Sequence, residues 1–145
     1  STNVSEEYNG SSWSNVNSMP VVGSNTGDCG QEQTAAVATI PGGSTSLEYD
    51  GTNWTAGGST PGGAFSSAGG GPATDCILAA DIGIRYNGTA WSTDANLSSP
   101  RTSSSGGKMG DGTTGIVFGG APSPNGALTE EYTGTFLGSK LVTTS

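Results

Sequence analysis

Short apolar runs return at intervals along this chain, separated by long stretches rich in Gly, Ser and Thr. Residues 35–40, 76–80 and 116–118 form the apolar runs, and each is followed by a tyrosine several residues further on. Short apolar runs bounded by turn-forming residues are typical of β-strands. A pattern that returns about every 40 residues is typical of a β-repeat array. The chain is therefore predicted to be all-β.

Each tyrosine opens a segment that predicts a β-hairpin. The clearest copy centres on Asp50-Gly51, a pair that favours a two-residue type I′ turn because both central residues of that turn need positive φ. This turn would place Tyr49 opposite Thr52 and Leu47 opposite Trp54, all on one side of the pleat. The four copies are Tyr8-Asn9-Gly10 with Trp13, Tyr49-Asp50-Gly51 with Trp54, Tyr86-Asn87-Gly88 with Trp91, and Tyr132-Thr133-Gly134 with Leu137.

The aromatic residues of the hairpins are predicted to form a repeated core between sheets. Two sets of three residues correspond, namely Leu47, Tyr49 and Trp54, and Ile84, Tyr86 and Trp91. Because an aliphatic residue accompanies each of these aromatic pairs, we expect the pairs to be buried. The alternative is that Trp13, Trp54 and Trp91 form an exposed platform on which sugar rings stack.

The composition is unusual for a folded chain. Apolar residues make up only 31% of the 145 positions and the net charge is −8, values that approach those of disordered proteins. Evenly spaced aromatic residues argue for a folded repeat instead. With only four basic residues, nucleic acid is not an expected partner. There is also no apolar run of the length that membrane insertion requires.

Two covalent modifications are compatible with the sequence. Cys29 and Cys76 could form one disulfide, as is usual in an extracellular or periplasmic setting, or they could be two small buried thiols. Five Asn-X-Ser/Thr sequons make N-glycosylation possible, although such sequons also arise by chance in a chain this rich in Asn, Ser and Thr. The sequons begin at Asn3, Asn9, Asn53, Asn87 and Asn96.

The sequence offers no recognisable catalytic site. It contains no histidine, which excludes the Ser-His-Asp triad and histidine general bases. Carboxylates outside the hairpins have no glycosidase signature; they are Asp28, Asp75, Asp81, Asp94 and Asp111. Gly110-Asp111-Gly112 offers an oxygen ligand of the kind that Ca²⁺ takes, but Asp beside Gly is also the ordinary composition of a turn. We therefore expect no enzymatic activity and no cofactor, with a structural calcium ion as the minor alternative.

The repeat resembles the kelch repeat, in which a strand ends in a double glycine and is followed by a tyrosine and then a tryptophan. The resemblance rests on three segments, namely Ile116-Val117-Phe118-Gly119-Gly120 before Glu131-Tyr132, Ala38-Thr39-Ile40-Pro41-Gly42-Gly43 before Tyr49 and Trp54, and Pro100-Arg101. The sequence departs from the pattern at two positions: Ala79-Ala80 replaces the second double glycine, and Leu137 replaces the last tryptophan. The chain is similar to Gly/Ser/Thr-rich kelch-like arrays of phage tail, virion and bacterial surface proteins. That resemblance implies propeller-type sheets, a structural or adhesive role, and an extracellular, cell-surface or virion location.

The number of repeats predicts an incomplete array. Three four-stranded kelch-like units are expected, at Cys29–Trp54, Cys76–Trp91 and Lys108–Leu137. Residues 1–14 are left as an unpaired N-terminal half-unit beside a repeat domain spanning residues 15–145. Propellers close with at least four units, so the array must stay open or be completed by a neighbouring subunit. Strand exchange with the next copy would supply the missing part, and if its rotation does not close it produces a filament.

The two ends of the array carry the candidate subunit junction. Glu-Glu precedes the first and last tyrosines, whereas the internal copies have Leu47-Glu48 and Ile84-Arg85. These terminal charges either mark a junction or simply discourage random pairing of edge strands. The junction candidates are Glu6, Glu7, Tyr8, Trp13, Glu130, Glu131, Tyr132 and Leu137.

Two functions follow as hypotheses from the sequence. The first is a self-assembling structural subunit of an extracellular or virion-associated fibre, whose partner is another copy of itself in a homo-oligomer or helical filament. The second is an adhesin or glycan-binding propeller module, whose partners are glycans.

Overall fold

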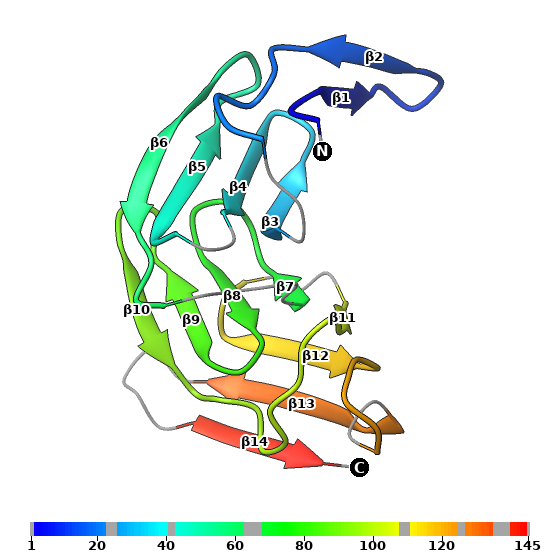
Figure 1. Cartoon of the computed structure of the whole chain (residues 1–145), viewed down its shortest axis with the longest axis vertical. Coiled ribbons are helices and arrows are strands. Elements are labelled where there is room, and N and C mark those ends of the chain that lie inside the picture. Colours follow the sequence, from blue (N-terminus) through cyan, green and yellow to red (C-terminus); the bar gives the residue numbers. More distant parts are fainter. Residues whose placement is uncertain are drawn as a thin grey trace.

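The computed structural model is an all-β chain whose sheets follow one another around an open arc (Figure 1). It describes residues 2–22, 26–40, 43–62, 68–107, 111–124, 127–134 and 140–144, the last with its backbone only. The N-terminal hairpin lies at one end of the arc and the last sheet at the other (Figure 1). None of the described segments forms a helix of the length and hydropathy that crossing a membrane requires.

The described strands form one two-stranded and three four-stranded antiparallel sheets. We call the first the N-terminal hairpin; it consists of β1 (Ser5–Tyr8) and β2 (Trp13–Val16). Unit 1 consists of β3 (Gly27–Glu32), β4 (Ala35–Thr39), β5 (Thr45–Tyr49) and β6 (Trp54–Ser59). Unit 2 consists of β7 (Ala68–Gly70), β8 (Cys76–Ala79), β9 (Gly83–Tyr86) and β10 (Trp91–Asp94). Unit 3 consists of β11 (Ser105–Gly106), β12 (Thr114–Phe118), β13 (Thr129–Gly134) and β14 (Lys140–Thr144).

The predicted architecture of three four-stranded units and a half-unit is confirmed. Strand order follows the chain within every unit, so β1 and β2 correspond to the last two strands of a unit. Units 2 and 3 begin with strands that precede their predicted starts at Cys76 and Lys108. Those strands, β7 and β11, consist of Ala, Gly and Ser, and so give no apolar signal in the sequence. On the inner side of the arc, β7 lies between β3 and β11 and contacts both (Figure 1).

The predicted pairing across the Asp50-Gly51 hairpin is wrong. Tyr49 pairs directly with Trp54, and Leu47 pairs with Ala56 rather than with Trp54. The other two aromatic hairpins have the same register, with Tyr8 opposite Trp13 and Tyr86 opposite Trp91. The connection is therefore a four-residue loop and not a two-residue type I′ turn.

The longer loop forms because the first side chain after the tyrosine caps the backbone. The Asp50 carboxylate Oδ1 accepts hydrogen bonds from the backbone N–H groups of Thr52 (2.8 Å) and Asn53 (2.7 Å). Only Gly51 needs positive φ, at 88°. Asx side chains commonly bond to the backbone two residues on. Asn9 and Asn87 make the same pair of bonds in their own loops.

The fourth copy has a different register from the other three. Strand β13 continues through Gly134, and Tyr132 pairs with Val142. Val142 therefore lies opposite the tyrosine, where tryptophan stands in the other copies. Leu137 itself lies outside the described residues. Thr133 stands where the other copies have Asp or Asn, so this copy has no carboxylate or amide side chain directly after its tyrosine.

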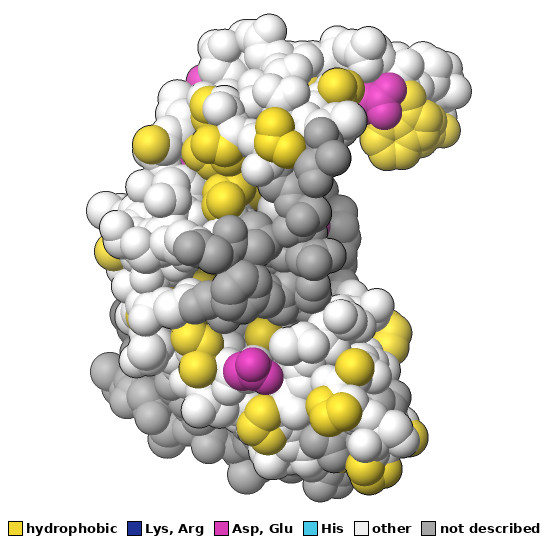
Figure 2. All heavy atoms as spheres, in the orientation of Figure 1, with side chains coloured by type: hydrophobic (Ala, Val, Ile, Leu, Met, Phe, Trp, Pro, Cys, Tyr) yellow, Lys and Arg dark blue, Asp and Glu magenta, His cyan; other side chains and the backbone are white. Residues whose placement is uncertain are grey.

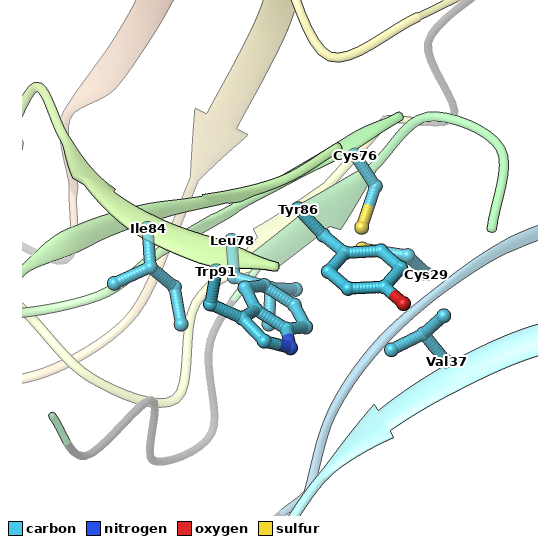
Figure 3. Packing of buried hydrophobic residues seen from close by; sticks show 7 residues of the cluster. All are labelled: Cys29, Val37, Cys76, Leu78, Ile84, Tyr86 and Trp91. Atoms are coloured by element: carbon cyan, nitrogen blue, oxygen red, sulfur yellow. The ribbon is translucent and has the colours of Figure 1, made fainter. Parts of the chain in front are cut away.

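The core lies between sheets, as the repeated aromatic positions predict. Its larger cluster joins Cys29 and Val37 of unit 1 to five residues of unit 2 (Figure 3). Those five residues are Cys76, Leu78, Ile84, Tyr86 and Trp91. A smaller cluster joins unit 2 to unit 3 and comprises Ala68, Ala79, Leu97 and Val117. Each sheet thus buries its face against the next sheet, so the array is held together from neighbour to neighbour.

Candidate assembly faces

A pair of side-chain hydrogen bonds joins the N-terminal hairpin to unit 1. The Tyr49 hydroxyl donates to Glu7 Oε1 (2.6 Å), and Trp54 Nε1–H donates to Ser5 Oγ (3.0 Å). The bond to the Glu7 carboxylate, together with desolvation, raises the pKa of Tyr49 to about 12, which keeps the hydroxyl protonated as a donor. We call this pair of bonds the junction clamp.

The clamp is repeated between units 1 and 2. Tyr86 donates its hydroxyl to Glu48 Oε1 (2.5 Å), and Trp91 Nε1–H donates to Ser46 Oγ (3.0 Å). Burial and the Glu48 carboxylate raise the pKa of Tyr86. At both junctions the acceptors stand one and three residues before the tyrosine of the preceding sheet. Sequence reasoning missed the acceptor serines, although Ser5 and Ser46 share that spacing.

The two donors of each clamp are held together by ring packing. The ring centroids of Tyr49 and Trp54 are 5.0 Å apart with a tilt of 36°, and those of Tyr86 and Trp91 are 5.0 Å apart with a tilt of 35°. Direct cross-strand pairing brings both rings to the same face of the sheet. The structure thus supports the predicted burial of this repeat core, with Leu47, Tyr49, Ile84, Tyr86 and Trp91 buried and Trp54 half-buried.

The junction between units 2 and 3 keeps only part of the clamp. Tyr132 donates its hydroxyl to Asp94 Oδ1 (2.8 Å) rather than to a residue next to the preceding tyrosine. Arg85 occupies the position of the acceptor glutamate and instead forms an ion pair with Asp75 (2.7 Å). Gly83 occupies the position of the acceptor serine, because a Cβ there would lie 1.9 Å from the backbone oxygen of Ala95. The serine acceptor and the tryptophan donor are therefore both replaced at the same junction.

Glu130, a predicted junction residue, bonds β13 to the segment that connects units 2 and 3. Its carboxylate Oε1 accepts from Arg101 (2.6 Å), and both side chains are almost fully buried. Oε2 accepts from the backbone N–H and the hydroxyl of Ser98 (2.7 and 2.8 Å). Burial alone raises the pKa of Glu130, but the bonds from Ser98 and Arg101 outweigh it and the pKa lies below its ordinary value. The Pro100-Arg101 motif thus supplies a buried countercharge, a role that the sequence did not reveal.

The first face of the array carries a pair of clamp donors at the N-terminal hairpin. Tyr8 and Trp13 have the same ring packing as the internal pairs, with centroids 5.2 Å apart and a tilt of 39°. They are 45% and 68% exposed, whereas Tyr86 and Trp91 at an internal junction are 2% and 8% exposed. Figure 2 shows apolar and acidic atoms together at this end of the molecule. We call Glu6, Tyr8 and Trp13 the leading face; Glu7 points the other way, to Tyr49.

The opposite face of the array lies on unit 3. Thr129 and Glu131 stand three and one residues before Tyr132, which are the acceptor positions of the clamp. Glu131 is exposed and Thr129 is half-buried. They pair across the sheet with Phe118 and Ile116, so these four side chains share one side of it. We call this set the trailing face. Tyr132 and Glu130 point to the opposite side of the sheet, where Tyr132 contacts Asp94 of unit 2 and Glu130 contacts Ser98 of the segment that follows β10.

The N-terminal hairpin also has an open edge. β1 pairs only with β2 among the described strands, whereas the third strand of every unit pairs on both sides. The missing partner corresponds to the second strand of a unit. An open edge of this kind offers backbone N–H and C=O groups to an added strand.

The two cysteines meet at the interface of units 1 and 2 without being bonded. Cys29 and Cys76 are 5% and 0% exposed and are present as thiols, with their sulfurs facing each other (Figure 3). The contact with Cys76 and the burial raise the pKa of the Cys29 thiol. The structure thus brings together the two residues proposed as a disulfide.

The predicted sequon asparagines have structural roles of their own. Asn9 and Asn87 cap loops as described above. Asn3 donates to Met19 O (2.9 Å), Asn53 accepts from Asn17 (2.8 Å), and Asn96 accepts from Gly83 N–H (3.0 Å). All of them are exposed except Asn3, which is half-buried. N-glycosylation at these positions stays a prediction.

The acidic residues considered for chemistry are dispersed. Asp75 pairs with Arg85, Asp94 accepts from Tyr132, and Asp111 accepts from the backbone N–H and hydroxyl of Thr113. Asp111 therefore stabilises its own turn, and Gly110 lies outside the described residues. In the part of the chain that the structure describes, no three acidic or cysteine side chains converge as metal ligands.

Comparison with known protein families and with curated proteins finds no match to this chain.

Proposed function

We propose that this protein is a non-enzymatic structural subunit that self-assembles through its end faces into an extracellular or virion-associated fibre. The observation that carries the proposal is the exposed Tyr8–Trp13 pair, which has the geometry of two pairs that are engaged at internal junctions. A surface with unused hydrogen-bond donors and exposed aromatic rings is a typical interface core.

The arrangement of sheets favours propagation over a closed monomer. The four sheets follow an open arc with different surfaces at its two ends (Figure 1). Contacts between unlike surfaces of identical subunits produce rings when the rotation closes and filaments when it does not. The open edge of β1 offers a second contribution through strand exchange, in which a neighbour supplies the missing strand. The kelch-like repeat and its resemblance to fibre and surface proteins agree with this role.

Sedimentation velocity and negative-stain microscopy over a range of protein concentrations test the proposal. We expect the wild-type chain to form filaments or larger oligomers, and Trp13→Ala to raise the concentration needed for assembly. Val22→Ala is the matched control, because Val22 is 57% exposed and belongs to neither end face. A wild-type chain that stays monomeric at all concentrations would refute the proposal.

Point substitutions are preferable to removal of the whole hairpin. Deleting residues 1–14 would remove Ser5 and Glu7 and uncover Tyr49 and Trp54, which form an equivalent donor pair. The truncated chain would therefore present a new leading face of the same chemistry. If the truncated chain assembled, the result would not show whether the N-terminal hairpin or any exposed tyrosine–tryptophan pair of the repeat drives assembly.

A glycan-binding module is the second candidate. A hollow of about 350 Å³ lies among the inner strands β3, β7 and β11, within the size range of ligand pockets. The residues that line it include Asp28, Ser104 and Ser105, which have polar side chains. Binding to an array of immobilised glycans, measured on protein that is monomeric, would favour this function. Absence of glycan binding together with filaments would favour the first.

A further inference from the structure

We infer that the partner of the leading face is the trailing face of a second copy, in a contact that reproduces the internal junction clamp. In this contact Tyr8 donates its hydroxyl to Glu131, and Trp13 Nε1–H donates to the hydroxyl of Thr129. The inference rests on the proposed function and adds to it the identity of the receiving surface.

The acceptor positions are assigned from the two complete clamps. Glu7 and Glu48 each precede a tyrosine by one residue and each accept a tyrosine hydroxyl from the next sheet. Ser5 and Ser46 precede the same tyrosines by three residues and accept from tryptophan. In unit 3 these positions hold Glu131 and Thr129, so a carboxylate and a hydroxyl are present in the required order. Unit 2 has Arg85 and Gly83 there and lacks both acceptors.

The apolar part of the junction is also reproduced. In unit 1, Val37 pairs with Glu48 and lies buried in the cluster that contains Tyr86 and Trp91. In unit 3, Ile116 pairs with Glu131 and therefore holds the position of Val37.

Phe118 extends this apolar surface beside Thr129. It pairs with Thr129 and is 44% exposed, one of the few large hydrophobic side chains exposed in the described residues. Ile116 and Phe118 thus provide a seat for the rings of Tyr8 and Trp13. The trailing face combines apolar and acceptor groups. The leading face combines apolar and donor groups with one carboxylate, Glu6, at the position that Leu47 and Ile84 hold in units 1 and 2.

This contact has a direction, which makes a mixing experiment possible. A head variant, Trp13→Ala, keeps its trailing face, and a tail variant, Thr129→Val with Glu131→Lys, keeps its leading face. Neither should assemble alone at the wild-type threshold concentration. The threshold should rise at least about 30-fold for the head variant, which loses an aromatic anchor, and at least about tenfold for the tail variant, which loses a charged hydrogen bond. An equimolar mixture should form one-to-one dimers, because one intact leading face meets one intact trailing face.

Thr133→Val is the control for the tail variant, since Thr133 lies on the same side of β13 but two residues beyond Glu131. It should assemble like the wild type. Thr129→Val alone serves as a milder second variant, and equal unfolding midpoints under monomeric conditions establish that the variants are folded.

Two results overturn the inference in distinguishable ways. If the wild type assembles and the tail variants assemble equally well, the trailing face is not the partner, while the proposed function stands. The same conclusion holds if the mixture of head and tail variants stays monomeric. If the wild type itself never assembles, the proposed function fails and this inference fails with it.

Discussion

The same substitution at two equivalent tryptophans should separate folding from assembly. Trp13 and Trp91 each pair across a hairpin with a tyrosine and have the same ring packing. Trp91 is 8% exposed and donates to Ser46, whereas Trp13 is 68% exposed. We therefore predict that Trp91→Ala destabilises the monomer and that Trp13→Ala mainly impairs assembly.

The expected magnitudes follow from the covered areas. Trp91 is 8% exposed, so about 230 Å² of an indole side chain of roughly 250 Å² is covered, and Trp→Ala changes at such sites cost about 3–5 kcal/mol. Trp13 is 68% exposed, so only about 80 Å² is covered, which sets an upper bound of about 2 kcal/mol at 25 cal/mol per Å². Covering Trp13 to the level of Trp91 would remove about 150 Å² more from water, worth about 4 kcal/mol.

Urea unfolding at a concentration where the protein is monomeric measures the first effect. Stability that depends on protein concentration would otherwise mix folding with assembly. For a chain of this size the loss at Trp91 corresponds to a melting temperature lower by roughly 6–20 °C. Sedimentation velocity measures the second effect, and Trp13→Ala should raise the assembly threshold at least about 30-fold, the equivalent of a 2 kcal/mol hot spot.

The reasoning is refuted if the two substitutions destabilise the monomer equally, because Trp13 would then be buried in solution. It is also refuted if folded Trp91→Ala loses assembly as strongly as Trp13→Ala does. Trp91 lies between units 1 and 2, so its removal should leave the assembly threshold of the folded protein nearly unchanged.

Three further predictions concern the interior of the array. Arg101→Met should cost about 3–5 kcal/mol by leaving the Glu130 carboxylate buried without its countercharge, whereas Arg101→Met with Glu130→Leu should recover most of that loss in urea unfolding. The pKa of Glu130 is depressed in the folded state, so its contribution to the free energy of unfolding should be complete above the unfolded carboxyl pKa of about 4.3 and should disappear as pH falls through the lower folded pKa. Over that pH range the wild type should lose stability relative to the double variant, and a pH series without this loss would contradict the prediction. Gly83→Ser should destabilise the protein and should not restore a clamp at the third junction, because a Cβ there meets the backbone carbonyl that follows β10; an unchanged unfolding midpoint would contradict the close approach. The thiols of Cys29 and Cys76 should react with a thiol-specific dye only after unfolding, since both are buried and the pKa of Cys29 is raised; rapid labelling of the native protein would show that they are accessible.

The local order of the sequence was sufficient to predict the repeat and its strands. Apolar runs and evenly spaced aromatic residues indicate which segments are strands. Strands that follow one another in the sequence usually pair with each other, so the order of strands within each sheet could also be predicted. The turn was predicted wrongly because Asp50-Gly51 satisfies two loop geometries, and the side-chain cap on the following N–H groups decides between them. The bounds of the inner strands could not be predicted, because glycines such as Gly69 permit close backbone approach and give no hydrophobic signal.

The sequence by itself determined that this chain is an all-β repeat array with a surplus half-unit at its N-terminus and Glu-Glu pairs before its first and last tyrosines. Only the tertiary structure decided what those glutamates do. Glu130 is buried with Arg101, Glu7 accepts from Tyr49, and Glu131 remains exposed at an acceptor position. The physical reason is the alternation of side chains along a strand, which sends adjacent residues to opposite sides of a sheet. Which side meets a neighbouring sheet depends on the order of the sheets in space, and that order is set by packing rather than by the local sequence.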